Sequence, residues 1–204
     1  MKRNFKYVKT GQMRSMTVHL LKWPKELMEN RHVQNAAELN ISITRANYND
    51  VLNYLNANQN LKKLKLSTTS NFKLPAKFFK SDAFRRLEVA IFDMATKITD
   101  ADFLSSEAPV IDIREPISAE TLNRKLRRWF ESRLDLDVRY RIRSNVEINK
   151  SVVKRGLPFE EFGGENGCAM IERPDGKIGC LHFPENLISF SILEFDENDI
   201  LRIE

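Results

Sequence analysis

Residues 61–66 read Leu-Lys-Lys-Leu-Lys-Leu, and close copies of this phrase recur along the chain at nearly fixed intervals. Four copies share the form apolar-x-x-apolar-x-apolar, and their middle apolar residues are Leu39, Leu64, Leu87 and Ile111. The steps between these positions are therefore 25, 23 and 24 residues. A period in this range is typical of leucine-rich repeats, in which strand-plus-helix units stack side by side. Such a solenoid is usually a binding surface and seldom a catalyst.

Each copy begins a short run of alternating apolar and polar residues, as expected for a strand with one buried face. The third copy consists of Phe84, Leu87 and Val89, which places Leu87 and Val89 on the buried face. The predicted strands are residues 38–43, 64–68, 87–93 and 110–115, with weaker copies near residues 15–20 and 138–140. Helical patterns occupy residues 25–29, 49–57, 99–105 and 118–133. A helix of this kind fits the crossover that parallel strands require.

The pattern changes after about residue 145. Arg173-Pro174-Asp175-Gly176 predicts a hairpin turn, because proline presets φ at the second position and glycine accepts positive φ at the fourth. Residues 170–172, 178–181 and 188–195 would be the antiparallel strands, and residues 156–167 a loop. We therefore predict an α/β fold: degenerate leucine-rich-repeat-like βα units over residues 1–145, forming a solenoid with a parallel sheet, closed by a C-terminal hairpin or meander over residues 146–204.

Polar strand positions between the apolar ones should point away from the helices and form an exposed row. Because solenoids bind partners along such a surface, we predict that this row contacts an unidentified protein target. Its members are Asn40, Ser42, Lys65, Ser67, Glu88, Asp112, Arg114, Arg139 and Arg141.

The helix predicted over residues 118–133 has an apolar face and a basic face. Ser118 is a suitable N-cap, and the apolar face consists of Leu122, Leu126, Trp129 and Phe130. The basic side chains are Arg124, Lys125, Arg127 and Arg128. Three interpretations remain open for them: they face water, they pair with the acidic C-terminal segment or a partner, or they contact phosphates. Nucleic-acid modules usually interleave exposed aromatic residues with the charges, and here the aromatic residues lie on the apolar face.

The net charge of +5 is unevenly distributed along the chain. Residues 1–160 carry 30 Lys and Arg against 18 Asp and Glu, a charge of +12, whereas residues 161–204 carry 3 against 10, a charge of −7. A basic surface attracts phosphate through the release of counterions. A basic nucleic-acid-binding module is therefore the alternative to a protein-interaction domain, although we consider it the less favoured of the two.

No pattern predicts catalysis or a cofactor. His19, His32 and His182 have no metal-ligand partner at short spacing, and the spacing of Cys168 and Cys180 matches no zinc or redox motif. The two cysteines are expected on neighbouring strands, close to each other, as reduced and half-buried thiols. Asp100 and Asp102 suit the start of a helix better than a metal site. We therefore expect no enzyme, metal or cofactor, no membrane span or secretory signal, and a location inside the cell, in the cytoplasm or nucleus.

The second half of the chain carries a resemblance to a known family. Residues 102–131 combine a short helix, an apolar strand and a helix with a basic-Trp pair, and residues 167–194 form a hairpin with an Asp-Gly turn. These stretches resemble the F-box-associated domain (type 2) of a nematode F-box family, so that residues 101–195 would correspond to that domain. The positions that match are Leu122, Asn123, Arg128, Trp129, Arg173, Asp175 and Gly176.

This resemblance implies the substrate-recognition half of a cullin-based ubiquitin-ligase subunit, in which an N-terminal F-box binds the ligase adaptor and the C-terminal domain holds the target. The chain departs from the pattern because an F-box is not found. Leu74-Pro75 resembles the start of one but sits between two predicted strands. Contact with the adaptor is therefore not expected. A truncated paralogue, a partial gene model and a binder that works without a ligase would each account for the departure.

Overall fold

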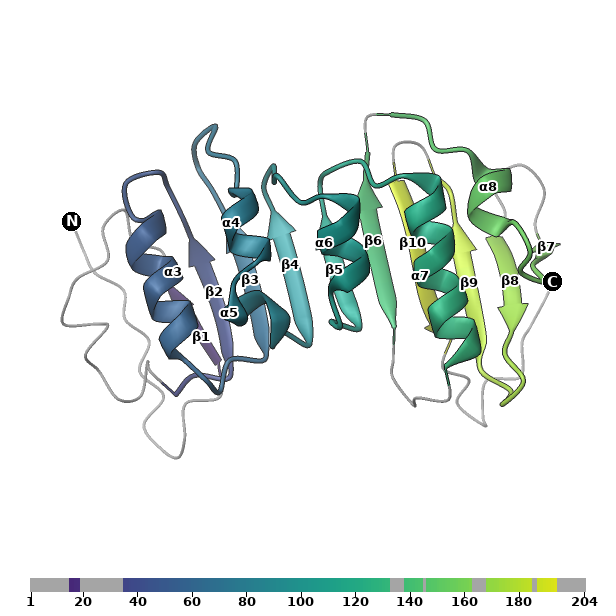
Figure 1. Cartoon of the computed structure of the whole chain (residues 1–204), viewed down its shortest axis with the longest axis horizontal. Helices are drawn as coiled ribbons and strands as arrows, with labels where there is room; N and C mark the ends of the chain where they lie inside the picture. The colour runs from purple at the N-terminus through teal and green to yellow at the C-terminus, as the bar shows by residue number, and fades with distance from the viewer. Residues whose placement is uncertain are drawn as a thin grey trace, which may run out of the picture. The chain divides into compact units, whose positions relative to one another are not determined.

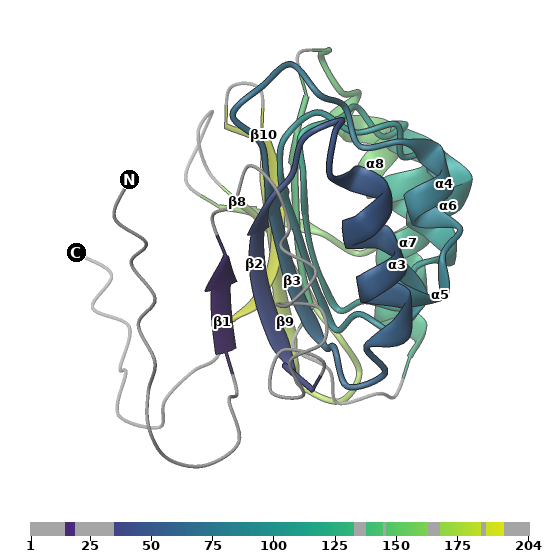
Figure 2. The ribbon, with the colours of Figure 1, turned by 90° about the vertical axis from the view of Figure 1, so that its left-hand side faces the viewer.

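The fold comes from a computed structural model that describes residues 15–18, 35–132, 138–144, 146–162, 168–184 and 187–193. The chain divides into two compact units, Met1–Lys97 and Ile98–Glu204. In each unit, helices pack against one face of a β-sheet (Figures 1 and 2). The α/β class predicted from the sequence is therefore confirmed. The helix predicted over residues 25–29 lies outside the described residues.

The first unit consists of parallel strands that alternate with helices, as predicted. Its strands are paired in the order β1-β2-β3-β4, and every pair is parallel and in register. The elements are β1 (Ser15–Val18), β2 (Glu38–Ser42), α3 (Tyr48–Ala57), β3 (Lys63–Ser67), α4 (Ala76–Phe79), α5 (Asp82–Arg85) and β4 (Val89–Asp93).

The register of β4 differs from the prediction by three residues. Leu39 of β2 lies opposite Leu64 of β3, as the repeat predicts, but Leu64 lies opposite Ala90 rather than Leu87. Ala90 is buried, whereas Val89 is half-exposed. The third copy of the phrase is thus Leu87, Ala90 and Phe92, and the assignment of Val89 to the buried face is wrong. A shift by an odd number of residues exchanges the two faces of a strand, because side chains alternate along it.

A cluster of four phenylalanine rings explains this register. Phe78 of α4, Phe79 of α4, Phe84 of α5 and Phe92 of β4 are all buried. Their ring centroids lie 5.2–6.2 Å apart, and most pairs meet edge to face. Burying an aromatic side chain of this size contributes about 1.5–3 kcal/mol before entropy is subtracted. Phe92 can join the cluster only if β4 turns Ala90 and Phe92 inward.

The second unit combines a parallel pair with an antiparallel meander. β5 and β6 are parallel, and every later pair is antiparallel, in the linear order β5-β6-β10-β9-β8-β7. The change of direction falls after β6, close to the predicted change near residue 145. The elements are α6 (Asp100–Ser105), β5 (Val110–Ile113), α7 (Ala119–Glu131), β6 (Arg139–Arg143), α8 (Lys150–Lys154), β7 (Glu160–Phe162), β8 (Cys168–Glu172), β9 (Ile178–His182) and β10 (Leu187–Leu193).

The hairpin of β8 and β9 forms around the predicted turn. Gly176 has φ +87°, and its N–H donates to the carbonyl of Arg173 at 2.9 Å. Arg173 is only 2% exposed and donates from Nη1 to the carbonyl of Trp129 and to Ser132 Oγ, each at 3.3 Å. Its Nε donates to Asp175 Oδ1 at 2.7 Å, and this hydrogen bond lowers the pKa of Asp175 to about 2. The turn arginine therefore binds the last residues of α7.

Helix α7 packs its apolar face on the antiparallel strands. The N-cap Ser118 accepts from the N–H of Thr121, as predicted. Leu122, Leu126 and Trp129 are buried, and the Trp129 ring lies 4.9 Å from that of Phe190 on β10. Phe130, predicted for the same face, is only half-buried.

Polar side chains of α7 bind the C-terminal end of α6. Lys125 Nζ donates to the carbonyls of Ser106 and, at 3.4 Å, Phe103. Arg128 Nη1 donates to the carbonyl of Leu104 at 2.6 Å. The last carbonyls of a helix have no partner within it, so these three contacts satisfy acceptors that would otherwise need water. They also hold α7 against α6.

A second set of contacts connects α7 to α8. Asn123 Nδ2 donates to the carbonyls of Val153 at 2.7 Å and Arg155 at 2.9 Å. Asn123 Oδ1 accepts from Arg127 Nε at 3.1 Å, and Arg127 Nη2 donates to the same Arg155 carbonyl at 2.8 Å. The polar side of α7 is therefore used largely within the unit.

Candidate interaction surface

The sheet of the second unit has one face that none of the described helices covers (Figure 2). Along β6, buried Tyr140 and Ile142 alternate with the exposed Arg139 and Arg141. The described helices pack on the side of the buried residues, so the arginines lie on the opposite side. We call five residues on this side the arginine face: Asp112, Arg114, Arg139, Arg141 and Arg143.

Asp112 is the single carboxylate of the arginine face. Arg143 binds it with both nitrogens, Nη1 to Oδ1 at 3.0 Å and Nη2 to Oδ2 at 3.1 Å. Arg141, directly opposite Asp112 in the sheet, approaches Oδ2 at 3.8 Å. The side chain of Asp112 is 14% exposed, against 46% for Arg141 and 36% for Arg143. The carboxylate therefore orients the guanidinium groups while they remain accessible.

The sequence predicted four of these five residues and missed Arg143. Asp112 and Arg141 come together as a cross-strand pair, and Arg139 lies opposite Val110 on the same two strands. Arg114 follows β5 directly and is exposed. Arg143 continues the alternation of Arg139 and Arg141, and this period of two was the signal that could have found it.

The other predicted members lie in the first unit. Asn40 of β2 pairs with Lys65 of β3, and Ser42 pairs with Ser67, so these four residues do form two cross-strand rows. Glu88 does not belong with them, because β4 begins at Val89. Glu88 is exposed at the start of that strand and forms an ion pair with Lys62 at 2.8 Å. Its predicted place in the polar row assumed that Val89 faces the core, whereas Ala90 and Phe92 do.

Cysteine and histidine side chains meet on β8 and β9. Cys168 pairs directly with His182, and Cys180 lies two residues before His182 on the same strand. Cys180 Sγ lies 3.0 Å from His182 Nε2, and the ligand atoms of all three residues lie within 4.8 Å of one another. Cys180 is 2% exposed, and burial raises the pKa of its thiol to about 12, with further contributions from Cys168.

These positions confirm one prediction and overturn another. The two cysteines do lie on neighbouring strands as free thiols, with Cys168 half-buried and Cys180 fully buried. The prediction that His182 has no metal-ligand partner at short spacing is wrong. It overlooked Cys180, two residues earlier on the same strand, and the antiparallel register of β8 and β9 also brings Cys168 opposite His182.

Most of the basic side chains of α7 form hydrogen bonds within the second unit. Lys125, Arg127 and Arg128 each donate to a backbone carbonyl of a neighbouring segment, and only Arg124 is without such a contact among those described. Lys125 is 5% exposed, so of the three interpretations the one in which the basic side chains face water does not hold for this residue. Most of the acidic C-terminal segment lies outside the described residues, which leaves its predicted pairing with this helix a prediction.

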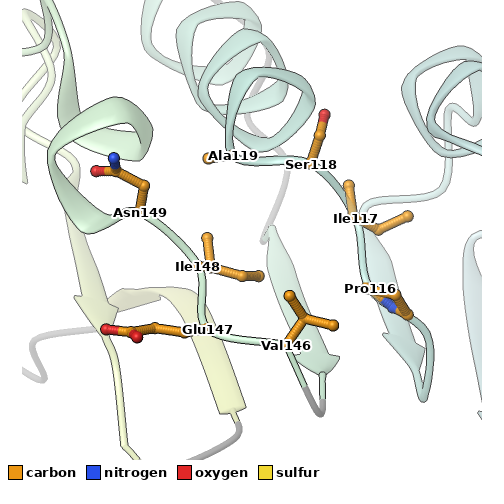
Figure 3. A pocket seen from close by; sticks show the side chains of 8 residues that line it. All are labelled: Pro116, Ile117, Ser118, Ala119, Val146, Glu147, Ile148 and Asn149. Atoms are coloured by element: carbon orange, nitrogen blue, oxygen red, sulfur yellow. The ribbon is translucent and has the colours of Figure 1, made fainter.

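A small hollow lies beside the first turns of α7 and α8 (Figure 3). Its volume is about 210 Å³, below the range of about 300–1,000 Å³ that is typical of ligand sites. Ile117, Val146 and Ile148 contribute much of its apolar wall, and Glu147 is the one titratable residue among those that line it. The hollow therefore offers neither a paired acid and base nor a nucleophile beside a base.

Within the described ranges, each helix falls short of the length and apolar character that crossing a bilayer requires. Comparisons with protein-family models, with curated proteins and with solved structures returned no match to this chain.

Proposed function

We propose that the chain is a non-enzymatic protein-interaction domain, and that its arginine face binds an acidic segment of a protein target. The observation that carries this proposal is the composition of the face, with four guanidinium groups and one carboxylate on β5, the residue that follows it and β6. A guanidinium group binds a carboxylate through two parallel hydrogen bonds. Clustered charge of one sign also speeds the encounter with a partner of opposite charge.

The resemblance of residues 101–195 to F-box-associated domains suggests what this binding serves. We propose target recognition inside the cell, as in the substrate-binding half of a ubiquitin-ligase subunit. We further propose that the strand-helix units form a leucine-rich-repeat-like solenoid, which the in-register parallel pairing of β1 to β4 supports. Because no F-box was found in the sequence, we do not expect the ligase adaptor to copurify with this chain.

Peptide selection tests the proposed target chemistry. We expect peptides that bind the purified chain, selected from a random display library, to be enriched in Asp and Glu. The variant Arg139→Glu/Arg141→Glu should bind them at least about tenfold more weakly, a loss of about 1.4 kcal/mol. Binding constants from fluorescence anisotropy would measure the difference.

Arg124→Glu is the control for a charge reversal away from the arginine face, because Arg124 is an exposed arginine of the same unit on the helical side. It changes the net charge without altering the arginine face, so the selected peptides should bind it nearly as well as the wild type. Peptides without acidic enrichment, or equal losses in the control and the double variant, would remove the arginine face as the binding site.

Nucleic acid is the competing ligand, because phosphate also binds guanidinium groups. Unrelated single-stranded and duplex oligonucleotides should bind weakly or not at all near physiological salt. Tight binding that weakens steeply with salt and is lost in Arg139→Glu/Arg141→Glu would replace the proposed function with a nucleic-acid-binding one.

A further inference from the structure

The hairpin of β8 and β9 carries a group of metal-ligating side chains that the proposed function does not use. Two thiols and one imidazole, from Cys168, Cys180 and His182, place their ligand atoms within 4.8 Å of one another. We propose that these three side chains bind one zinc ion, with water at the fourth position. Three protein ligands and an exchangeable fourth position form an established type of zinc coordination.

The backbone of the hairpin brings these side chains together. Cys168 and His182 are a directly paired antiparallel couple, and their side chains therefore leave the sheet on the same side. Cys180 and His182 are two residues apart on one strand, so they also share that side. All three ligands thus come from paired strands rather than loops, which favours a site of defined geometry.

The distances suit zinc after small side-chain movements. Zinc bonds of about 2.3 Å to sulfur and about 2.0–2.1 Å to nitrogen place tetrahedral ligands about 3.8 Å apart for two sulfurs and about 3.6 Å apart for sulfur and nitrogen. Cys180 Sγ lies 3.0 Å from His182 Nε2, and no two ligand atoms are more than 4.8 Å apart. Shifts of about 1 Å or less therefore give the required tetrahedron.

The kind of donor selects the metal. Thiolate sulfur and imidazole nitrogen are typical zinc ligands, whereas calcium and magnesium prefer oxygen. Two thiolates also balance the charge of a divalent ion, so burying the Cys180 sulfur with zinc leaves no uncompensated charge at the site. Cysteine binds zinc as a thiolate, so each thiol must give up its proton to the solvent when the ion binds. Zinc binding must therefore release protons, and its affinity should fall as the solution becomes more acidic.

Cobalt titration of the reduced, metal-free chain tests the site. The sequence has only two cysteines, Cys168 and Cys180, so a thiolate-to-cobalt charge-transfer band can arise only from them. We expect this band to saturate at one cobalt ion per chain and to disappear when zinc is added. Zinc should also raise the midpoint of thermal unfolding, because a ligand that binds only the folded state stabilises it.

Two variants assign the ligands without disturbing the core. Cys168 is half-buried and His182 is exposed, so Cys168→Ser and His182→Gln should fold, which circular dichroism would verify. Each should weaken zinc binding at least about tenfold, since losing even a supporting contact costs that much in zinc sites. The control His19→Gln/His32→Gln removes the other two histidines and should bind zinc as the wild type does.

Two results would overturn the proposal. One is a reduced protein in which both thiols react with a thiol reagent but cobalt produces no charge-transfer band. The other is zinc binding that is equally tight in wild type, Cys168→Ser and His182→Gln, because the ion would then be held elsewhere. Neither result bears on the arginine face, so this site and the proposed function can fail separately.

Discussion

Lys125 is the clearest example of a side chain whose charge is costly where it lies. Its ammonium group is buried beneath the rings of Phe103 and Tyr140, 5.7 Å from each centroid. Desolvation, with a smaller effect from Arg128, lowers the pKa of Lys125 from 10.5 to about 8. The carbonyls of Phe103 and Ser106 offset part of this cost by accepting hydrogen bonds.

The lowered pKa of Lys125 predicts how stability depends on pH. Between about pH 8 and 10.5 the unfolded chain keeps a proton on Lys125 that the folded chain has released. Unfolding therefore takes up a proton, and this residue's contribution to stability rises with pH across that window, by up to about 3 kcal/mol. Denaturant unfolding of the wild type minus that of Lys125→Met, measured at several pH values, isolates the effect. Parallel pH profiles would contradict it.

Gly179 is required for space rather than for an unusual backbone conformation. A Cβ atom there would lie 2.6 Å from Phe190 Cζ and 2.9 Å from Trp129 Cη2. We expect Gly179→Ala to lower the free energy of unfolding by about 1–3 kcal/mol, as overpacking does. In a Phe190→Leu background the same change should cost less, because the closest ring is gone. An equal cost in both backgrounds, measured by denaturant unfolding, would mean that the clash is not the cause.

At the scale of the element, substitutions in β4 distinguish the observed register from the one that the repeat phrase predicted. Phe92 is buried within the phenylalanine cluster, and its neighbour Ile91 is half-exposed on the other face. Phe92→Ala should therefore lower the unfolding free energy by about 3–5 kcal/mol. Ile91→Ala should cost less than half as much. With the predicted register, in which Val89 and Ile91 face the helices, the order of the two losses would be reversed in denaturant unfolding.

Helices α4 and α5 explain why the repeat phrase predicted the wrong buried face for β4. Each is four residues long, too short for a helical period to emerge from the sequence. Their rings, Phe78, Phe79 and Phe84, recruit Phe92 and so decide which face of β4 is buried. By contrast, α7 spans thirteen residues, and its apolar positions and N-cap were identified correctly apart from Phe130.

At the scale of the whole molecule, the division into two compact units predicts that a destabilising substitution affects mainly the unit that contains it. Phe92 belongs to the unit Met1–Lys97 and Trp129 to the unit Ile98–Glu204. Replacing Phe92 with alanine should accelerate amide hydrogen exchange in β2 to β4. Replacing Trp129 with alanine should accelerate it in β6 and in β8 to β10. Mass spectrometry of both variants, compared with the wild type, measures this. Equal acceleration along the whole chain in either variant would show a single cooperative unit instead.

The sequence by itself determined the alternation of strands and helices in the first half, the antiparallel hairpin at the Asp-Gly turn and the start of α7, because each depends on neighbours along the chain. It also indicated Arg114, Arg139 and Arg141 as a polar row with Asp112. Only the tertiary structure decided the register of β4, the burial of Lys125 and the meeting of Cys168 with His182. These depend on which side chains from distant segments share a space, and local periodicity does not encode that pairing.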